Sequence, residues 1–396
     1  MKLALLTSHP IQYQAPWFRF LAENGFSGLR VFYLWDGGVS SRFDPGFGRT
    51  VKWDIPLLEG YEFEFVPNRA RRPGTDTRFG LNNPELGPRL ANFGPDAVLF
   101  LGYNYLSYYR VLFSRLHRMV PLLFRGDSHR LVPEHGLRSG LRRQWIRFVF
   151  RRFAAFLFVG LANKDYFRLH GIPEARLFFS PHSVDNQRFF AQAETAVRQA
   201  ADWRASLGIS PAELVVLFAG KFERKKRPRD LAAAFRRADL PGTRLLMVGS
   251  GEEENELRAD AAGGPRILFA PFQNQTEMPR TYAAADLFVL PSFGRGETWG
   301  LAVNEAMCLG RPIIVSSHVG CAQDLVQSGR NGLVFPAGDI PALVGALRDA
   351  FSDPVRLKTW GAASREIIQN YSYDEATRGL RQALDSLNHR KQDTNH

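Results

Sequence analysis

The chain has 396 residues, of which 45% are hydrophobic and 23% are charged, so it has the composition of a folded protein with room for two domains. Its formal net charge of +12 favours an anionic partner, which can be nucleic acid, a membrane surface or a phosphorylated substrate. With only two cysteines, Cys308 and Cys321, and no Cys and His cluster at metal-ligand spacing, the sequence argues against a disulfide framework and a zinc site.

The first ten residues contain one run of four apolar side chains, from Leu3 to Leu6. This run is too short for the core of a signal peptide and indicates a first buried strand. No apolar run elsewhere reaches the ~18 residues that a membrane span needs. We therefore expect a cytoplasmic protein.

Short apolar runs alternate with helical patterns along the chain, which is typical of parallel βαβ units. In the first half the runs are "LALL", "LRVFYL", "DAVLFLG", "PLLFRG" and "FLFVG"; in the second half they are "LVVLFAG", "RLLMVGSG", "RILFA", "DLFVLPS" and "RPIIVS". Several end in Gly or Ser, as expected where a strand opens onto a ligand crevice. The pattern predicts the α/β fold class, with two doubly wound parallel-sheet domains facing each other across a cleft.

A polar, helix-prone segment, residues 186–213, separates the two sets of strands. We place the domain boundary near residues 195–210. The first domain is then residues 1–200 and the second is residues 201–371, with a C-terminal helix at about residues 372–390 that packs back on the first domain.

A predicted helix around residues 142–156 has one apolar face and an opposite basic face. At helical spacing the apolar residues are Leu141, Trp145, Phe148, Val149, Phe153 and Phe156, and the basic ones are Arg143, Arg147 and Arg151. Two interpretations fit: a helix that docks on an anionic membrane, or a domain helix with a solvated basic face. Arg152 falls inside the apolar arc, which weakens both interpretations, and the second is slightly favoured.

Residues 296–310 predict a glycine-bearing loop followed by a helix that ends at Gly310. The first helix amides, at about Gly300 and Leu301, lack intrahelical partners and lie at the positive end of the helix dipole, which favours a phosphate. Glu305 lies one turn further on the same face, where its carboxylate can accept two hydrogen bonds from a ribose diol. Glu297 precedes the helix, on the side where a sugar hydroxyl would lie. The spacing therefore predicts one carboxylate for each end of a nucleotide-sugar.

The segment "LFAGKFERKKRP" places Lys221 and Lys226 after another strand and a glycine turn. Their ammonium groups can neutralise a diphosphate that arrives without a metal ion, although a solvated basic loop would look the same. The nearby "MVGSGEEENEL" contains a lone Gly-x-Gly without the third glycine of a dinucleotide fingerprint, so a Rossmann dehydrogenase is disfavoured.

These motifs resemble those of the retaining glycosyltransferases of family 4, which have the GT-B fold. The resemblance covers nearly the whole chain and is closest from Val215 to about Ala350. It rests on Glu297 and Glu305 separated by seven residues and followed by Ala306, and on "ADLFVLPS", "GRPIIVSSHVGCAQDLV" and "NGLVFPAGD". The first half is similar to members found in bacterial surface-polysaccharide clusters. The resemblance implies transfer of a sugar from a nucleotide-diphosphate donor. No Asp-x-Asp metal pair follows a predicted strand and the lysines supply positive charge, so we expect no metal ion and no cofactor.

The resemblance also implies roles for individual residues. Glu297 contacts the transferred sugar, Glu305 binds the ribose, and the amides of Gly300 and Leu301 hold the phosphates. Lys221 and Lys226 stand in the places of an Arg and Lys pair that binds the diphosphate, with Arg224 as an alternative for one of them. The remaining donor contacts are Thr298 and Trp299 beside the sugar, and Gly249 and Phe272 beside the base.

The acceptor is expected on the first domain. "SHPIQYQAPWF" contributes His9 and Gln12, and "FRGDSH" contributes Arg125, Asp127 and His129 to the same rim. We predict acceptor contacts for the first four and a catalytic role for His129, although a satisfied structural histidine is as common at such a place. His182, near the domain junction, is expected to be architectural.

The predicted function is retaining transfer of a sugar to a hydroxyl group of a saccharide or lipid-linked acceptor, with same-face attack preferred over a covalent intermediate. An epimerase or phosphorylase of the same fold remains an alternative, distinguished by the absence of net transfer. A nucleic-acid binder is disfavoured, since only residues 138–153 interleave aromatic and basic side chains. Peripheral contact with the inner face of an anionic membrane remains open.

Overall fold

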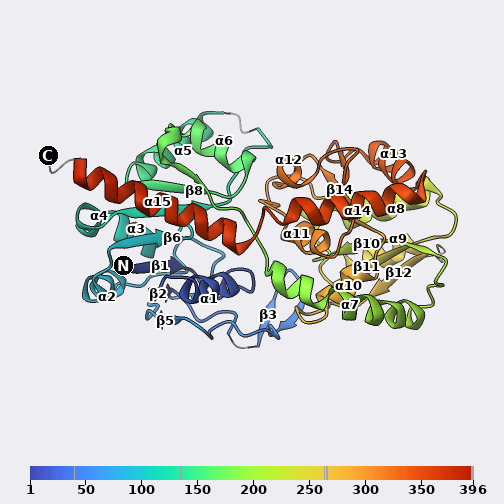
Figure 1. Ribbon diagram of the computed structural model, residues 1–396, viewed down its shortest axis with the longest axis horizontal. Coiled ribbons are helices and arrows are strands. Elements are labelled where there is room, and N and C mark those ends of the chain that lie inside the picture. Colours follow the sequence, from blue (N-terminus) through green and yellow to red (C-terminus); the bar gives the residue numbers. More distant parts are fainter. Residues whose placement is uncertain (40, 134–135, 263, 265, 394–396) are drawn as a thin grey trace.

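The computed structural model describes residues 1–39, 41–133, 136–262, 264 and 266–393. They form two α/β domains that lie side by side along the long axis of the molecule (Figure 1). Each domain is built on one parallel sheet with helices packed on it, which confirms the predicted fold class.

The first domain contains a seven-stranded sheet in the order β5-β2-β1-β6-β7-β8-β9. Its strands are β1 (Lys2–Thr7), β2 (Gly28–Tyr33), β5 (Glu62–Phe65), β6 (Ala97–Phe100), β7 (Leu122–Gly126), β8 (Ala155–Phe158) and β9 (Leu177–Phe179). Its helices are α1 (Ala15–Glu23), α2 (Leu86–Phe93), α3 (Leu106–Leu112), α4 (Leu116–Met119), α5 (Leu137–Phe150), α6 (Leu161–Leu169) and the 3-10 helix η1 (Glu174–Arg176). The five inner strands coincide with the predicted apolar runs. The edge strands β5 and β9 were not predicted, because they are short and β5 alternates Glu with Phe.

The second domain contains a six-stranded sheet in the order β12-β11-β10-β13-β14-β15. Its strands are β10 (Leu214–Ala219), β11 (Thr243–Val248), β12 (Ile267–Ala270), β13 (Leu287–Leu290), β14 (Ile313–Ser316) and β15 (Gly332–Phe335). Its helices are α7 (Asn186–Ser206), η2 (Arg224–Lys226), α8 (Pro228–Ala238), α9 (Glu254–Ala261), α10 (Met278–Ala283), α11 (Leu301–Cys308), α12 (Ala322–Leu325), α13 (Ile340–Phe351) and α14 (Pro354–Ile368). A last helix, α15 (Tyr373–Asp393), follows. All the predicted runs of this half are strands, and only β15 was not predicted.

Both sheets bury their strands on two faces, which explains why the strands appear in the sequence as continuous apolar runs. In β1, Leu3 and Leu5 belong to one core cluster and Ala4 and Leu6 to another, because successive side chains of a strand point to opposite faces. The strand order reverses between β1 and β6 in the first sheet and between β10 and β13 in the second. Ligands of open parallel sheets bind at such points, beyond the carboxyl ends of the strands.

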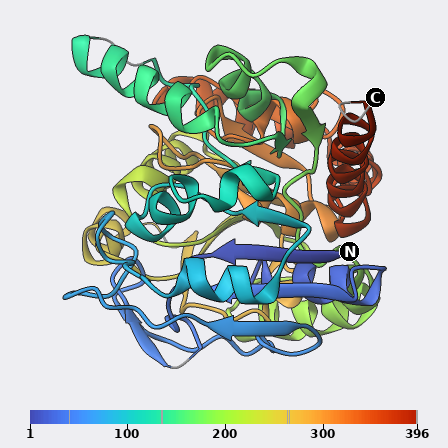
Figure 2. The same cartoon turned by 90° about the vertical axis from the view of Figure 1, so that its left-hand side faces the viewer.

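The chain crosses between the domains twice. Helix α7 packs against α10 and α11 of the second domain, and α15 packs against β8, β9 and α1 of the first. In Figure 2 the dark red α15 runs along one side of the first domain. The first crossing therefore precedes α7, whereas the boundary predicted near residues 195–210 falls inside that helix.

A small antiparallel hairpin, β3 (Arg42–Asp44) and β4 (Arg49–Val51), leaves the first domain between β2 and β5. It reaches the second domain, where Ser250 Oγ donates to the Phe47 carbonyl at 2.8 Å and Asn274 Nδ2 donates to the Lys52 carbonyl at 2.7 Å (Figure 1). We call residues 42–54 the strap.

The predicted apolar face of α5 is correct for Val149 and wrong for Leu141, Trp145 and Phe148. Ile146, Val149 and Phe150 are the side chains of this helix that reach the core, while Leu141 is 74% exposed and Trp145 and Phe148 are also exposed. The helix ends at Phe150, so Phe153 and Phe156 are buried after the helix and are not part of its face. None of the helices in the described ranges combines the length and hydrophobicity that crossing a membrane requires.

Candidate active site

The carboxyl ends of both sheets open onto one cavity of about 860 Å³ between the domains, which we call the cleft. Most of the predicted site residues line it: His9, Gln12, Arg125, Asp127, Lys221, Lys226, Gly249, Phe272, Glu297, Thr298, Trp299, Gly300, Leu301 and Glu305. Residues distant in sequence meet here because they follow strands that end at the same edge of a sheet.

Glu297 lies in the loop after β13 and is only 9% exposed. Its Oε2 accepts a hydrogen bond from Lys226 Nζ at 2.6 Å and another from Ser292 Oγ at 2.9 Å. Burial works to raise the pKa of Glu297, but the Lys226 ammonium and these hydrogen bonds outweigh it and lower the pKa. The carboxylate is therefore charged at neutral pH, and it is held by one of the two predicted lysines.

Glu305 lies one turn into α11 and is 1% exposed. Its Oε2 accepts a hydrogen bond from the Tyr282 hydroxyl at 2.7 Å, while Oε1 has no hydrogen-bond partner within the described part of the chain. Burial raises the pKa of Glu305 to about 7, although Tyr282, Arg188 and the nearby side chains of Gln275 and Tyr13 act in the opposite direction. A buried acceptor without a partner is unfavourable, so this oxygen is suited to a hydrogen-bond donor that enters from the cleft.

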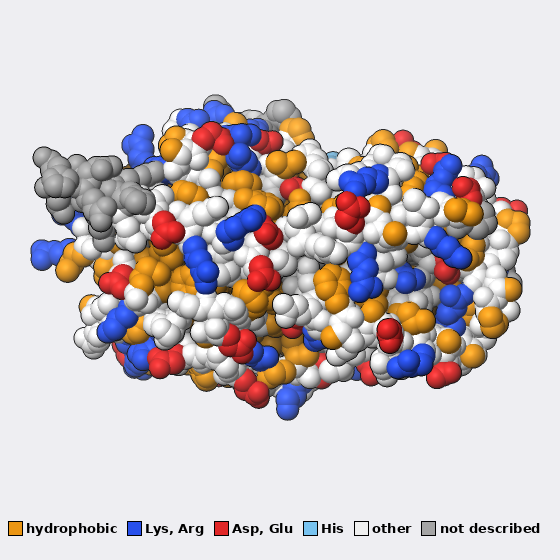
Figure 3. Space-filling model, viewed as in Figure 1, with side chains coloured by type: hydrophobic (Ala, Val, Ile, Leu, Met, Phe, Trp, Pro, Cys, Tyr) orange, Lys and Arg blue, Asp and Glu red, His pale blue; other side chains and the backbone are white. Residues whose placement is uncertain are grey.

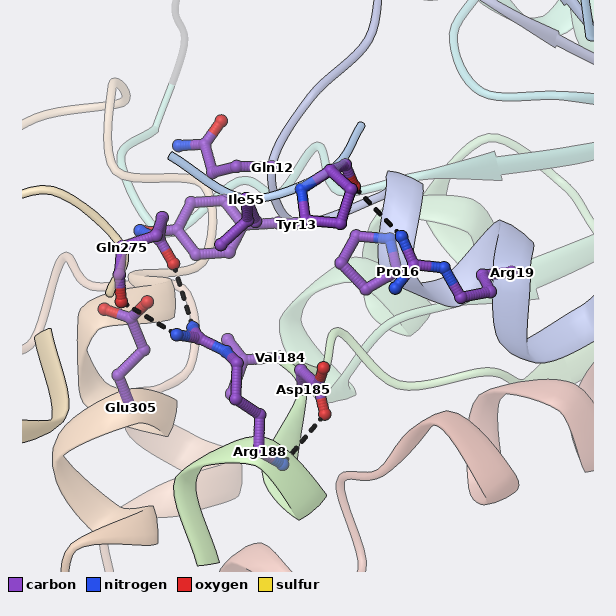
Figure 4. Close-up of a pocket in the computed structure, with 11 residues that line it drawn as sticks. Gln12, Tyr13, Pro16, Arg19, Ile55, Val184, Asp185, Arg188, Gln275 and Glu305 are labelled. Atoms are coloured by element: carbon purple, nitrogen blue, oxygen red, sulfur yellow. Dashed lines mark hydrogen bonds between the residues drawn. The ribbon is translucent and has the colours of Figure 1, made fainter. Parts of the chain in front are cut away.

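A smaller cavity of about 70 Å³ adjoins Glu305 at the domain junction (Figure 4). Arg188, near the start of α7, donates to the Gln275 carbonyl at 2.8 Å and to Gln275 Oε1 at 3.1 Å. Figure 4 shows the Tyr13 ring of the first domain beside Gln275. The environment of Glu305 is thus assembled from both domains.

Gly300 begins α11 with a φ of 99°, in the left-handed region that favours glycine. A Cβ atom at this position would lie 2.9 Å from Val319 Cγ1 and 3.1 Å from Leu290 Cδ2. The backbone therefore turns sharply into the helix and presents its first amides to the cleft. These amides have no partners within the helix and lie at its positive end, which suits an anion.

Lys221 follows β10 and is held by the strap. Its Nζ lies 2.9 Å from Asp44 Oδ1 and 4.8 Å from the centre of the Phe47 ring. Phe47 in turn contacts Phe272, with 4.6 Å between ring centres. The strap thus covers the part of the cleft where the sequence predicts the base and part of the diphosphate.

Asp127 follows β7 and connects the two domains across the cleft. Its Oδ2 accepts a hydrogen bond from Thr298 Oγ1 at 2.7 Å and lies 3.5 Å from His182 Nε2. Burial works to raise the pKa of Asp127, but the hydrogen bonds from His182 and Thr298 outweigh it and lower the pKa to about 2. His182, expected to be architectural, therefore lines the cleft as well.

Two predicted site residues, Arg224 and His129, do not line the cleft. Arg224 is exposed in η2. The Nε2 of His129 lies 3.2 Å from the Glu297 carbonyl, and its Nδ1 accepts from the Leu131 amide at 3.2 Å. Because a carbonyl only accepts, Nε2 carries the proton, and both ring nitrogens are engaged. This geometry suits a role for His129 in positioning Glu297, and it suits the predicted catalytic role less well.

Arg125, which the sequence predicts as an acceptor contact, lines the cleft with its charge turned into the protein. Its Nη2 donates to the Pro181 carbonyl at 2.8 Å, and its guanidinium lies 4.8 Å from the Trp17 ring. Burial lowers the pKa of Arg125 to about 10. Arg125 therefore ties β7 to the segment after β9. His9 remains in the cleft wall, with Nδ1 2.9 Å from Ser8 Oγ.

The sequence analysis missed several residues of the site: Tyr13, Asp44, Arg188, Gln275, Tyr282 and Ser292. Ser292 carried a usable signal, because it follows β13 as the other site residues follow their strands. Asp44 and Arg188 carried no such signal, because the strap and α7 reach the site only through the tertiary fold. No group of three or more His, Cys, Asp or Glu side chains in the described ranges is arranged to hold a metal ion.

Comparison with solved structures shows the same fold. A crystal structure of Anabaena HepE in complex with UDP and glucose has a TM-score of 0.73 and 19% identity, and the match covers 98% of this chain and 100% of that chain. This likeness supports the predicted GT-B fold.

Comparison with curated proteins identifies relatives. A "GDP-mannose-dependent alpha-mannosyltransferase" of Corynebacterium glutamicum is 30% identical over 347 residues, which are 83% of this chain and 79% of that protein. A "D-inositol 3-phosphate glycosyltransferase" of Rhodococcus opacus is 31% identical over 189 residues, which are 45% of this chain and 42% of that protein. The chain spans 42% of the length of this Rhodococcus relative, and 51% and 58% of the lengths of two further curated relatives.

The family itself is identified by its sequence profile. The profile described as "Glycosyl transferases group 1" matches residues 199–391, which include nearly all of the second domain and almost the whole of α15. Together with the long match to the Corynebacterium protein, it confirms the family resemblance that the two glutamates suggested. The chain belongs to the glycosyl transferases group 1 family.

Proposed function

We propose that the protein transfers a sugar from a nucleoside diphosphate sugar to a hydroxyl group of an acceptor, with retention of the anomeric configuration. The observation that carries the proposal is Glu305, a buried carboxylate whose Oε1 has no partner among the described residues and which lines the cleft one turn into α11. A ribose diol can donate hydrogen bonds to it. The names of the relatives, a mannosyltransferase and an inositol phosphate glycosyltransferase, support sugar transfer.

The other cleft residues fit a donor laid along the start of α11. In the proposal, Glu297 contacts the transferred sugar, and the amides of Gly300 and Leu301 hold the diphosphate. Thr298 and Trp299 then adjoin the sugar, and Gly249 and Phe272 adjoin the base. All of these residues line the same cleft.

Catalysis in this proposal is stabilisation of the departing nucleoside diphosphate. Negative charge develops on the diphosphate as the sugar bond breaks, and fixed cations and amides stabilise that charge without reorganising. Lys226 is placed for this task, since its Nζ is already 2.6 Å from Glu297 at the sugar end. Lys221 becomes available when Asp44 releases it. The lysines and the helix amides supply this charge without a metal ion.

The acceptor is proposed to enter from the first domain, past His9, Gln12 and Asp127. A saccharide or a lipid-linked precursor of the cell envelope fits this side. The Glu297 carboxylate is engaged by Lys226 and Ser292, which favours same-face attack over a covalent intermediate on that residue. An epimerase or phosphorylase would instead give the donor epimer or a sugar phosphate, with no net transfer. Figure 3 shows acidic side chains interspersed with basic ones over the face in view, which does not favour a nucleic-acid binder on that face.

The test removes the ribose hydroxyl and the carboxylate in turn. Binding of GDP, UDP and their 2′-deoxy and 3′-deoxy counterparts is measured with wild type, Glu305→Ala and, as control, the exposed Glu256→Ala. Both bases are included because one relative is named for GDP-mannose and the HepE structure holds UDP. Loss of a hydrogen bond to a charged group weakens binding about tenfold or more.

Wild type and the control should therefore bind a deoxy nucleotide about tenfold more weakly than the corresponding ribonucleotide. Glu305→Ala should bind the ribonucleotide and its deoxy counterpart equally weakly. If Glu305→Ala discriminates between them as wild type does, Glu305 does not bind the ribose. Net transfer from the corresponding donor sugar, followed by nucleotide release, then separates a transferase from an epimerase.

We also propose that the first domain contacts an anionic membrane through α5. The support is an exposed aromatic cluster, in which Phe113 stacks on Phe148 at 5.6 Å and Trp145 lies 5.7 Å from Phe148. Arg152 lies 5.4 Å from the Phe148 ring. Aromatic and basic side chains together favour the surface of an anionic bilayer. Trp145→Ser with Phe148→Ser should reduce sedimentation with anionic vesicles, whereas Val355→Ser, which removes a more exposed apolar side chain of the second domain, should not. Equal sedimentation of wild type and both variants would contradict the proposal.

A further inference from the structure

Trp299 lies in the loop that leads from Glu297 to the start of α11. We call residues 297–300 the donor loop, because the sugar and the diphosphate are proposed to lie along it. Trp299 lines the cleft, yet its side chain is only 3% exposed. The indole is therefore held in contacts with the protein, and these contacts indicate its role.

The indole contacts both segments by which the chain crosses between the domains. Its ring centre lies 5.7 Å from that of His182 in the first crossing, and 6.1 Å from that of Tyr371 in the second. The two crossings are joined to each other, since Asn186 Nδ2 donates to the Tyr371 carbonyl at 3.2 Å. One side chain of the donor loop thus packs on both connections.

A buried hydrogen-bonded chain fixes the indole N–H. Trp299 Nε1 donates to Asn304 Oδ1 at 2.8 Å, and Asn304 Nδ2 donates to the His182 carbonyl at 3.1 Å. Asn304 lies in α11 and is fully buried, so a broken bond on either side would leave a polar group unsatisfied at a high cost. The orientation of the indole is therefore coupled to the same crossing that its ring contacts.

The first domain has a place for the indole. Gly160 lies between β8 and α6, and a Cβ atom there would lie 2.8 Å from both Trp299 Cη2 and Asp324 Oδ2. No larger residue fits at this close approach. Each carboxylate oxygen of Asp324 also accepts from the Leu161 amide at 3.0 Å. Trp299 and Asp324 of the second domain thus brace the start of α6 in the first.

These contacts restrict the orientation of the domains at the point where the chemistry is proposed. Domains joined by short connections are expected to turn relative to each other unless further contacts prevent it. The acceptor is proposed to lie on the first domain and the sugar at the donor loop. A misplacement of about 1 Å between reacting groups can lower a rate about a hundredfold. The contact that fixes the donor loop against the first domain therefore matters for transfer.

We propose that Trp299 is a positioning residue of the transfer reaction. Its indole holds the donor loop against both crossings and so keeps the first domain, with its acceptor, in register with the bound sugar. The inference rests on the proposed function and adds to it a side chain that acts through the loop that carries it.

The first test measures the distance between the domains. Cys308 and Cys321 are fully buried, so spin labels can be attached to two introduced cysteines, Arg118→Cys on α4 and Asn255→Cys on α9, both at exposed positions. Pulsed electron paramagnetic resonance should give a narrow distribution of distances for the labelled protein. In Trp299→Ala the distribution should be at least about twofold wider, because the domains are no longer braced.

Trp360→Ala is the matched control. Trp360 belongs to the second domain, is also 3% exposed, and donates its Nε1 hydrogen to the Gly329 carbonyl of the same domain at 3.0 Å. Loss of a buried tryptophan is thus common to both variants, whereas contact with the crossings is specific to Trp299. The control should keep the narrow distribution. Equal widening in Trp299→Ala and Trp360→Ala overturns the inference.

A second variant changes the first domain and keeps the tryptophan, so it decides the question if Trp299→Ala does not fold. Gly160→Ala adds a methyl group that the indole must avoid, and it should also widen the distribution. Gly87→Ala in α2, where a Cβ atom meets nothing within 4 Å, should not. Trp299→Phe keeps a ring between the two crossings and should restore most of the narrow distribution. A narrow distribution in Gly160→Ala overturns the inference.

Hydrogen exchange measures the coupling to the donor. Exchange of residues 159–164 and 180–186 is followed with and without saturating GDP or UDP, whichever wild type binds. The nucleotide should slow exchange at least about threefold in wild type and Trp360→Ala, but not in Trp299→Ala. Equal slowing in Trp299→Ala and wild type overturns the inference. If neither nucleotide binds to wild type, the proposed function fails, and the distance measurement still decides whether Trp299 holds the domains.

Discussion

The two glutamates at the centre of the site have opposite pKa shifts although they lie eight positions apart. Lys226 lowers the pKa of Glu297, whereas burial raises the pKa of Glu305 to about 7. The difference comes from the neighbours that the fold supplies, an ammonium group in one place and a tyrosine hydroxyl in the other. Glu305 therefore takes up its charge close to neutral pH.

Donor binding should accordingly depend on pH. A neutral carboxyl accepts fewer hydrogen bonds than a carboxylate, so protonation of Glu305 opposes binding of a ribose diol. With a pKa of about 7 in the free protein, affinity for a nucleoside diphosphate should be about tenfold weaker at pH 6 than at pH 8. Calorimetry at both pH values tests this.

The Glu305→Gln variant is the control, because any pH dependence that it retains comes from the nucleotide itself. A dependence of the same size in this variant and in wild type would exclude Glu305 as its cause.

The free energy of unfolding should depend on pH in the opposite sense to donor binding. The pKa of Glu305 is higher in the folded chain than in the unfolded one, so the folded state holds the proton more tightly and loses stability as the pH rises from about 4.5 to about 7. Glu305→Gln removes this penalty. Its free energy of unfolding should exceed that of wild type by on the order of 2 kcal/mol at pH 8, with a much smaller difference at pH 5. Urea unfolding at the two pH values measures both, and an equal difference at both would contradict the burial argument.

At the scale of elements, the strap is a hairpin that owes its position to the other domain. Phe47 packs on Phe272, and Asp54 accepts a hydrogen bond from the Thr276 amide at 3.2 Å. In this position Asp44 neutralises Lys221, one of the two lysines proposed for the diphosphate. The strap thus competes with the donor for the same cation.

Replacing Asp44 should therefore strengthen donor binding. Asp44→Asn keeps the shape of the strap and releases the Lys221 ammonium, whose partly exposed ion pair is worth up to about 1 kcal/mol. Affinity for a nucleoside diphosphate should rise about twofold to fivefold. Asp54→Asn, in the same strap, changes a carboxylate that bonds to Thr276 and not to Lys221, so it is the matched control and should show no gain. Weaker binding by Asp44→Asn would show that the strap assists the donor.

At the scale of the whole molecule, the second half of the sequence stabilises both domains. Leu380 of α15 is fully buried in the core of the first domain, and Leu347 of α13 is fully buried in that of the second. Both leucines are near the C-terminal end of the sequence. They nevertheless belong to the cores of different domains.

Truncation of each leucine should affect a different domain. Leu380→Ala and Leu347→Ala each leave a cavity that costs about 2–5 kcal/mol. Hydrogen exchange should accelerate in β1 and β2 for Leu380→Ala, and in β10 and β11 for Leu347→Ala. Faster exchange in both domains for either variant would mean that the two cores unfold together.

Much of the fold was readable from the sequence because buried parallel strands leave a local pattern. The ten predicted apolar runs are strands, whereas β3, β4, β5, β9 and β15 were missed because each has three or four residues and none is buried along its whole length. The apolar face of α5 was assigned wrongly because helical spacing gives the relative angle of side chains but not which of them meets the core.

The sequence by itself determined the two doubly wound domains, the helix start at Gly300 and the pair Glu297 and Glu305, because these depend on residues close together in the chain. Only the tertiary structure decided what surrounds them: Arg188 and Gln275 near Glu305, and Asp44 on Lys221. Their elements lie far apart in sequence, and packing of the two domains brings them together. Charge, burial and pKa at this site follow from that packing, and no local pattern encodes them.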